Sequence, residues 1–152
     1  MTKIIDGKVI STSVKERVKA EVSKLKEKGI AVGLAVIIVG EDPASKVYVS
    51  NKKKACENLG INSEEYALPE STTNEELLAL IDELNSKPSI NGILCQLPLP
   101  SHLDEKLIIN SIDPEKDVDA FHPFNVGKIM IGDFDFLPCT PAGVMEMLKY
   151  EN

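Results

Sequence analysis

The sequence predicts an α/β fold, a three-layer arrangement in which helices cover both faces of an open, mainly parallel sheet. Three observations predict it. Short β-branched runs alternate along the chain with helical patterns of apolar residues, which is the order of β-α-β units. The first of these runs, 33–40, is continuously apolar, as in a strand that is covered on both faces. The length of 152 residues is that of one domain with a sizeable core.

Helices are expected on either side of this strand. The first is predicted to begin at Ser13, because Ser13 and Glu16 have the spacing of a capping box and an apolar stripe follows, with Gly29 as the stop. The second is expected between Pro43, which suits a first helical turn, and Gly60, which lies just past the end.

The rest of the chain continues the alternation. The expected elements are a strand at 64–68, a helix that starts at the capping box of Thr73 and Glu76, a strand at 92–96 after the Asn91-Gly92 turn, a short helix at 103–112 and a final helix that opens at Thr140-Pro141. Six of the nine prolines lie at or beyond Pro98, so this last third is expected to form ordered loops that build a site.

Charge and composition exclude several classes of protein. The net charge is −7, from 17 basic and 24 acidic residues, which disfavours non-specific binding to nucleic acids or membrane surfaces. The longest apolar run has six residues, far fewer than the ~20 that span a bilayer, and the first ten residues lack a signal-peptide core. Three cysteines without a CxxC pair indicate neither a disulfide framework nor a zinc ribbon, so we expect a cytoplasmic protein.

Three polar residues share one face of the second predicted helix. Ser45, Tyr48 and Lys52 are spaced i, i+3 and i+7. A lysine held beside a tyrosine and against apolar walls can exchange protons near neutral pH, which is the property of a general acid or base. The alternative interpretation is that the run from Lys52 to Lys54 is a solvated helix face.

Further candidates follow the third predicted strand. Gln96 stands at its carboxyl end, where an amide can orient a heteroaromatic ligand or a water, or can merely satisfy the loop backbone. Asp117 and Asp119 alternate, so in extended backbone they point the same way. One of these carboxylates could accept two hydrogen bonds from an amino-pyrimidine edge, and structural capping of the loop is the alternative.

Metal and nucleotide motifs are absent from the sequence. His102 and His122 lack the spacing of metal ligands, so no metal site is predicted. No two glycines are separated by a single residue, which excludes the GxGxxG fingerprint. Gly127 and Gly132 have P-loop spacing, but Asp133 stands where a lysine is required. We therefore expect no cofactor-binding residue in this chain.

Four segments form a recognisable set. They are EDPASKVYVSNKKKACENLGI at 41–61, GILCQLPLP at 92–100, PEKDVDAFHPFNVGK at 114–128 and PCTPAGVMEML at 138–148. Together they resemble the signature blocks of the bifunctional methylenetetrahydrofolate dehydrogenase/methenyltetrahydrofolate cyclohydrolase family, in the family's order. The resemblance implies that residues 1–148 form the tetrahydrofolate-binding catalytic domain and that the NADP-binding Rossmann domain lies outside this chain, which would then be a fragment.

The resemblance also implies a function in one-carbon metabolism. The family's enzymes are oxidoreductases and hydrolases that oxidise 5,10-methylenetetrahydrofolate with hydride transfer to NADP and then hydrolyse the 5,10-methenyl product to 10-formyltetrahydrofolate. By motif position, Lys52 is the catalytic lysine, Gln96 assists it, Tyr48 stacks on the folate ring system, Asp119 anchors the pterin and Ser45 supports the site. Asp117 is interpreted as structural, and Cys139 is not interpreted as a nucleophile. The full-length protein is expected to be a homodimer and this chain a monomer that cannot transfer hydride alone.

One position departs from the family. Ala120 stands where the family usually has glycine after the second aspartate. If this position requires a positive φ, alanine costs roughly 1 kcal/mol and would displace Asp119.

Two other functions remain open on the sequence. A stand-alone folate-binding or regulatory module would keep Tyr48 and Asp119 without needing Lys52 as a proton carrier. A receiver-like signalling domain has a similar alternation of strands and helices, but it needs an acidic residue where Cys95 and Gln96 stand.

Overall fold

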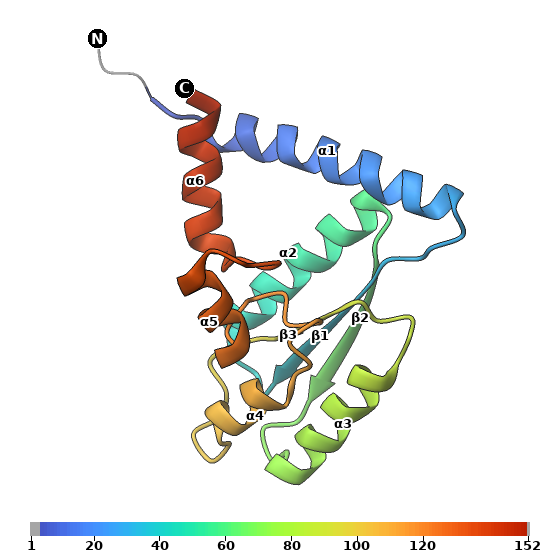
Figure 1. The fold of residues 1–152 in the computed structure, drawn as a ribbon. Helices are drawn as coiled ribbons and strands as arrows, with labels where there is room; N and C mark the ends of the chain where they lie inside the picture. The colour runs from blue at the N-terminus through green and yellow to red at the C-terminus, as the bar shows by residue number, and fades with distance from the viewer. Residues whose placement is uncertain (1–3, 152) are drawn as a thin grey trace.

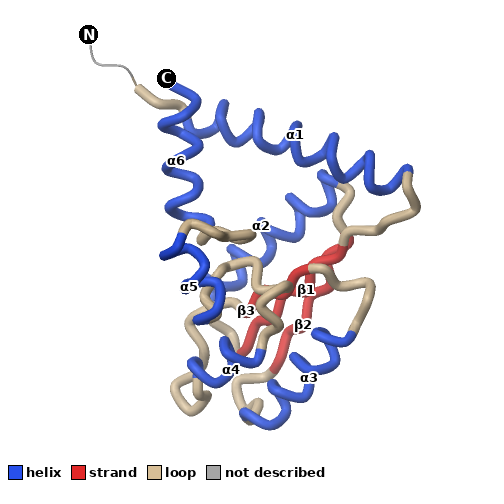
Figure 2. Tube along the Cα trace, viewed as in Figure 1, coloured by secondary structure: helices blue, strands red, loops and turns tan. Residues whose placement is uncertain are grey.

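The structure is a computed structural model that describes residues 4–151. Three parallel strands form one sheet in the order β2-β1-β3, and helices lie on both faces (Figures 1 and 2). The predicted α/β class and the predicted alternation are confirmed. The elements are α1 (Gly7–Glu27), β1 (Gly33–Val39), α2 (Pro43–Leu59), β2 (Asn62–Leu68), α3 (Asn74–Ser86), β3 (Gly92–Cys95), α4 (Glu105–Ser111), α5 (Pro123–Ile131) and α6 (Cys139–Glu151).

The central strand β1 explains the continuous apolar run. It pairs along its whole length with β2 and, from Leu34 to Ile37, with β3. Its alternate side chains enter two clusters on opposite faces of the sheet. Ala35, Ile37 and Val39 pack with α3 and α4, whereas Val36 and Ile38 pack with α2. A strand covered on both faces has no side for polar residues, which is why the run does not alternate.

The predicted start of the first helix is wrong. The helix α1 begins at Gly7, and Asp6 caps it by accepting a hydrogen bond from the backbone N–H of Lys8 at 2.9 Å. Ser13 and Glu16 therefore lie within the helix. The spacing of a capping box also occurs inside helices, and only the preceding backbone conformation distinguishes the two cases.

Other predicted boundaries are confirmed. Pro43 lies in the first turn of α2, and Gly60 ends this helix in the left-handed region with φ of 80°. The Thr73 hydroxyl accepts a hydrogen bond from the N–H of Glu76 at 3.2 Å, and the Glu76 carboxylate accepts one from the N–H of Thr73 at 2.9 Å. This reciprocal pair is the predicted capping box.

One helix, α5, lies where the sequence was expected to form loops. His122 caps it, because its Nδ1 accepts a hydrogen bond from the N–H of Phe124 at 3.1 Å. Pro123 occupies the first turn, and Gly132 ends the helix with φ of 80°. A proline at the start and a glycine just past the end are helix signals that the proline-rich composition of this region obscured.

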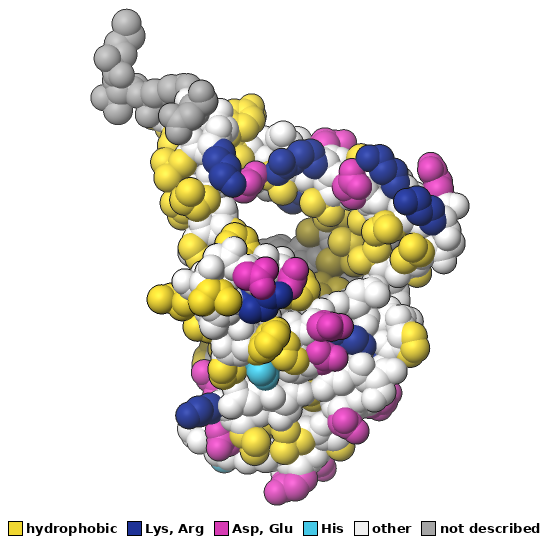
Figure 3. Space-filling view, in the orientation of Figure 1, with side chains coloured by type: hydrophobic (Ala, Val, Ile, Leu, Met, Phe, Trp, Pro, Cys, Tyr) yellow, Lys and Arg dark blue, Asp and Glu magenta, His cyan; other side chains and the backbone are white. Residues whose placement is uncertain are grey.

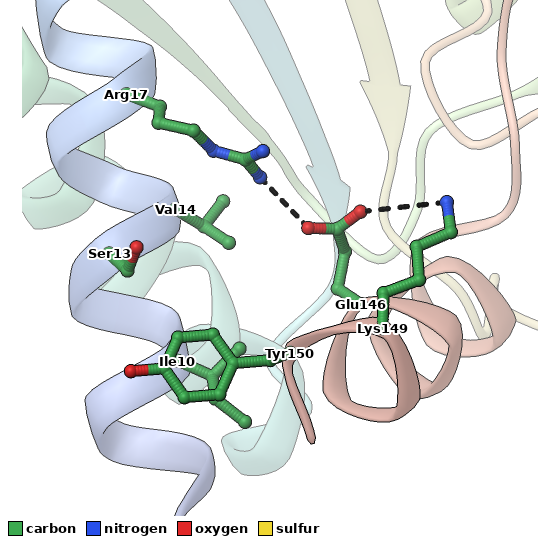
Figure 4. Close-up of a pocket in the computed structure, with 7 residues that line it drawn as sticks. All are labelled: Ile10, Ser13, Val14, Arg17, Glu146, Lys149 and Tyr150. Carbon is green, nitrogen blue, oxygen red and sulfur yellow. Dashed lines mark hydrogen bonds and ion pairs between the residues drawn. The ribbon is translucent and has the colours of Figure 1, made fainter. Parts of the chain in front are cut away.

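The helix α1 lies apart from the sheet. Figure 1 shows the arrowheads of β1 and β2 pointing away from it, and it packs on α2 and α6 instead. Residues of α1 and α6 line a cavity of about 360 Å³, which is bordered by the ion pair between Arg17 and Glu146 at 2.8 Å (Figure 4). Figure 3 shows apolar side chains around the hollow beneath α1. Among the residues that the structure describes, no helix is long and apolar enough to cross a membrane.

Candidate functional site

The structure brings together two candidate residues that are far apart in the sequence. Lys52 lies on α2 and Gln96 directly follows β3, and the Lys52 Nζ donates a hydrogen bond to the Gln96 Oε1 at 2.9 Å. Both side chains are partly buried. The Lys52 ammonium is thus held at the carboxyl end of the sheet, where sites gather in parallel α/β folds. The other two lysines of the run, Lys53 and Lys54, are exposed.

The amide of Gln96 is oriented by its neighbours. Its backbone N–H donates to the carbonyl of Ile37 at 2.8 Å, which continues the β1–β3 pairing by one residue. Its side-chain Nε2 donates to the carbonyl of Leu97 at 2.8 Å. The Oε1 is then left facing Lys52, and this is the only orientation that suits an ammonium, which has no acceptor. Gln96 therefore satisfies the loop backbone and also contacts the lysine.

Tyr48 and Ser45 have different environments. Tyr48 lies one turn before Lys52, and 61% of its surface is exposed, so its ring is free to contact a ligand. Ser45 is only 4% exposed, and its N–H donates to the Asp42 carboxylate at 2.7 Å. Hydrogen bonds from the Ser45 backbone and hydroxyl hold the pKa of Asp42 below its ordinary value. Ser45 thus stabilises the start of the helix that carries Tyr48 and Lys52.

Asp119 is a partly buried carboxyl group near the lysine. Burial raises the pKa of Asp119, the positive charge of Lys52 opposes this shift, and the negative charge of Asp117 adds to it. Asp119 is therefore within electrostatic range of Lys52, although it reaches the site from the loop after α4. A carboxylate with incomplete hydration gains from N–H donors on a ligand.

The two aspartates do not lie in extended backbone as expected. The chain turns at this point, since the N–H of Ala120 donates to the carbonyl of Asp117 at 3.2 Å and Ala120 has φ of 56°. Asp117 is 3% exposed, and its Oδ2 accepts hydrogen bonds from the N–H of His122 at 2.8 Å and the Nδ2 of Asn125 at 3.0 Å. These contacts match the interpretation of Asp117 as structural.

Ala120 adopts the conformation that glycine prefers. Its φ of 56° lies in the left-handed region, and it is only 1% exposed. The position does require a positive φ, so the alanine that replaces the family's usual glycine bears a backbone cost of roughly 1 kcal/mol.

Cys95 lies beside the site but is not placed for chemistry. Cys95 is buried directly before Gln96, and burial, with the charges of Asp119 and Glu105, raises its pKa to about 12. It stays a thiol at neutral pH and is a poor nucleophile. Cys139 is exposed at the start of α6.

Two residues that organise the site are not singled out by the sequence patterns. Asn125 of α5 donates to both the carbonyl of Pro114 and the carboxylate of Asp117. Lys116 donates to backbone carbonyls at the end of α3. Both lie within the 114–128 block, and membership of that block is the only sequence signal that could have found them.

Two kinds of ligand-binding group have no candidates in the part of the chain that the structure describes. Over residues 4–151 no group of three or more His, Cys, Asp and Glu side chains is arranged to hold a metal ion. The glycine-rich turn that receives a pyrophosphate needs glycines separated by one residue, and the sequence has no such pair.

The chain is similar to curated proteins over nearly all of its length. It is 63% identical over 147 residues to the bifunctional protein FolD of Acetivibrio thermocellus, which covers 97% of this chain and 52% of that protein. It is 59% identical over 152 residues to the FolD protein of Agathobacter rectalis, covering 100% of this chain and 54% of that protein. The chain thus spans about half the length of the curated relatives it matches.

Solved structures show the same fold. The bifunctional FolD enzyme of Campylobacter jejuni superposes with a TM-score of 0.95 at 52% identity, over 98% of this chain and 53% of that one. The dehydrogenase–cyclohydrolase of Trypanosoma brucei, solved with NADP and an inhibitor, gives 0.93 at 34% identity, over 99% and 52%.

The family model described as "Tetrahydrofolate dehydrogenase/cyclohydrolase, catalytic domain" matches residues 5–119. This segment contains all five candidate site residues, from Ser45 on α2 to Asp119 in the loop after α4. With the identities above, the match shows that the chain belongs to the tetrahydrofolate dehydrogenase/cyclohydrolase family.

Proposed function

We propose that this chain binds tetrahydrofolate derivatives and supplies the catalytic lysine of an enzyme that oxidises 5,10-methylenetetrahydrofolate and hydrolyses 5,10-methenyltetrahydrofolate. Family membership supports the reaction class. The observation that carries the proposal is the contact between Lys52 Nζ and Gln96 Oε1 at 2.9 Å, with Asp119 near the same lysine.

The hydrolysis needs a proton carrier at the reacting carbon. Water adds to the amidinium carbon of the methenyl group, a C–O bond forms, and the proton released from the water passes to the amine of Lys52. Lys52 then returns a proton to N5 as the C–N5 bond breaks, while the hydroxyl of the adduct loses its remaining proton to solvent and becomes the C=O of the formyl group on N10. Gln96 accepts one N–H of Lys52, so it orients the amine for this transfer.

Binding of the folate is assigned to the remaining site residues. The exposed ring of Tyr48 offers a flat apolar surface to the folate ring system. The carboxylate of Asp119 accepts two hydrogen bonds from the amino-pyrimidine edge of the pterin. Since burial disfavours the charged form of Asp119 in the free protein, these N–H donors replace hydration that the carboxylate lacks.

NADP is assigned to a part of the enzyme outside this chain. No glycine pair here can receive a pyrophosphate, so a calorimetric titration of NADP into this chain is expected to show no saturable binding. In the oxidation this chain holds the folate in place. We further propose that the protein is cytoplasmic, in keeping with its three free thiols. The full-length protein is proposed to be a homodimer and this chain alone a monomer.

The test is a pair of measurements on Lys52→Met, which retains the apolar stem and removes the amine. Hydrolysis of 5,10-methenyltetrahydrofolate by the full-length protein should fall by about 10²-fold or more, the range for loss of a general acid or base. Tetrahydrofolate affinity, measured by calorimetry, should change little. The matched control is Lys54→Met, because Lys54 is an exposed lysine two residues along the same helix.

The outcomes separate the two candidate functions. Normal hydrolysis by Lys52→Met would contradict the role of Lys52. Tetrahydrofolate binding by the wild-type protein without any hydrolysis above the uncatalysed rate would instead favour a binding or regulatory module.

A further inference from the structure

Lys116 links the loop that carries Asp119 to the end of α3. Its Nζ donates three hydrogen bonds to backbone carbonyls, those of Leu84 at 3.0 Å, Asn85 at 2.6 Å and Lys87 at 3.1 Å. These carbonyls end α3, where the last turn has no basic residue of its own. Two of these carbonyls also accept a backbone N–H, that of Leu84 from Lys87 at 3.3 Å and that of Lys87 from Ile90 at 3.1 Å. The Lys116 ammonium adds a charged donor at the negative end of the helix dipole.

The loop is held again at the two residues after Lys116. The carbonyl of Lys116 accepts a hydrogen bond from the N–H of Ile93 at 2.7 Å, and Asp117 forms a bridge with the same residue. Val118 packs over Gly92 so closely that a Cβ there would lie 2.5 Å from the Val118 Cγ1. Asp119 comes next, so its position is set by a short, tightly held run of backbone.

The end of α3 also receives the chain that leads to this run. The Asn85 side chain donates to the carbonyl of Ser111 at 2.8 Å and accepts from the N–H of Asp113 at 2.9 Å. The N–H of Lys116 then donates to the carbonyl of Asp113 at 2.8 Å. The last turn of α3 is thus a fixed support on which the loop rests, and the Lys116 ammonium is its charged contact.

We propose that Lys116 is a positioning residue for the folate site: by anchoring the loop to the end of α3, it places the carboxylate of Asp119 where the pterin binds. This inference rests on the proposed function, because it assumes that Asp119 receives the pterin. Lys116 itself does not touch the substrate. Its loss removes three of the hydrogen bonds that hold the loop and lets the loop shift, and displacements of ~1 Å can cost a binding or catalytic site a large part of its effect.

The test uses tetrahydrofolate as the ligand and this chain as the protein, with affinity measured by calorimetry and folding by thermal unfolding. Lys116→Met should weaken binding by about tenfold or more, because a displacement of ~1 Å in a binding group can cost a site a large part of its effect. The matched control is Lys87→Met. Lys87 adjoins the same end of α3, but its ammonium bonds Glu64 at 2.7 Å and Tyr66 at 3.3 Å, away from the loop. Its loss should leave affinity unchanged.

A double-mutant cycle distinguishes positioning from general destabilisation. In an Asp119→Asn background, Lys116→Met should cause little further loss of affinity, because the group it positions has already been altered. Lys116→Gln keeps two N–H donors, should lose less affinity than Lys116→Met, and provides a folded variant if the methionine variant unfolds.

Three results would separate failure of this inference from failure of the proposed function. If the wild-type chain binds tetrahydrofolate and Lys116→Met binds it with equal affinity, the positioning role is overturned and the proposed function is left intact. If only Lys116→Gln folds, the same comparison is made with that variant. Fully additive losses in the cycle would also overturn it, since Lys116 would then act other than through Asp119. Absence of tetrahydrofolate binding by the wild-type chain would contradict the proposed function itself.

Discussion

Burial raises the pKa of both Cys95 and Asp119, but the two side chains suit different roles. Cys95 is enclosed, and its pKa of about 12 keeps it a neutral thiol. Asp119 lies closer to the surface, where burial raises its pKa but the charge of Lys52 limits the shift. Burial leaves this carboxyl group with incomplete hydration, which suits it to binding paired N–H donors.

The first prediction concerns the pH dependence of folate binding through Asp119. The carboxylate, and not the neutral acid, accepts two N–H groups, so affinity should fall as the pH is lowered through a pKa that lies above the ordinary 3.8. Calorimetric titrations of tetrahydrofolate from neutral pH into the acid range should show this fall. Asp119→Asn should bind weakly and lose this dependence, and an unchanged pH profile in that variant would contradict the assignment.

The raised pKa of Asp119 makes folding stability depend on pH in the direction opposite to folate affinity. The neutral acid is favoured in the folded state, so the contribution of Asp119 to stability is fully present below 3.8 and is lost as the pH rises through the folded pKa. At neutral pH, Asp119→Asn should therefore be at least as stable as the wild-type protein while binding folate less well.

The second prediction concerns Ala120, where several small energies compete. Glycine would relieve about 1–2 kcal/mol of left-handed strain, but it would lose up to about 1 kcal/mol through chain entropy and about 0.8 kcal/mol of methyl burial. Ala120→Gly should thus be nearly neutral. Ala120→Val should cost about 2 kcal/mol or more, because a β-branched residue is strained at positive φ and the site is buried.

Urea unfolding measures both variants of Ala120. Ala67→Val serves as the control, since Ala67 is an exposed residue of the extended strand β2, where valine is favoured. Equal losses from valine at both positions would show that the φ of Ala120 imposes no strain.

Helix ends show how a single motif has different effects in different elements. Thr73 caps α3 with both reciprocal hydrogen bonds in place. Ser13 has the same spacing to a glutamate, yet it lies in the second turn of α1, whose true cap is Asp6. The backbone N–H groups at Ser13 are already paired within the helix, so its hydroxyl has no capping role.

The third prediction follows from this contrast. Thr73→Ala should lower the free energy of unfolding by about 1 kcal/mol, the usual cost of removing a cap. Ser13→Ala should be neutral or slightly stabilising, because alanine has the higher helix propensity. Equilibrium unfolding of the two variants checks this, and a comparable loss for Ser13→Ala would mean that α1 begins at Ser13 after all.

Across the whole molecule the core is confined to the sheet and its two helical layers. The helix α1 is outside these layers, and only Ile10 and Val22 of its residues are buried. Its ion pair to α6 joins side chains that are 66% and 38% exposed, and such pairs contribute at most about 1 kcal/mol. The helix is therefore attached to the rest of the fold by few stabilising contacts.

The fourth prediction is a difference in local stability between α1 and β1. Amide hydrogens of α1 should exchange with solvent much faster than those of β1, because α1 can open without disrupting the core. Native-state hydrogen exchange followed by mass spectrometry measures this. Protection of α1 equal to that of β1 would show that the helix unfolds only with the whole domain.

Local patterns were sufficient for most of the elements. The continuous apolar strand, the Thr73 cap, and the limits of α2 at Pro43 and Gly60 depend on residues within one or two turns of each other. The start of α1 and the existence of α5 were not predicted correctly. A capping-box spacing can occur inside a helix, and proline-rich composition suggested loops where Pro123 in fact begins one.

The sequence by itself determined the α/β class, the alternation of strands and helices along the chain and the residue types available for chemistry, because hydrophobic period and helix-end signals are local. Only the tertiary structure decided which of those residues meet. Two contacts join elements that are far apart in the chain, namely Lys52 with Gln96 and Lys116 with the end of α3. The turn at Ala120 depends on a backbone conformation that the residue type does not favour. Such contacts satisfy polar groups left over by local structure, and their partners are selected by packing, which no short spacing encodes.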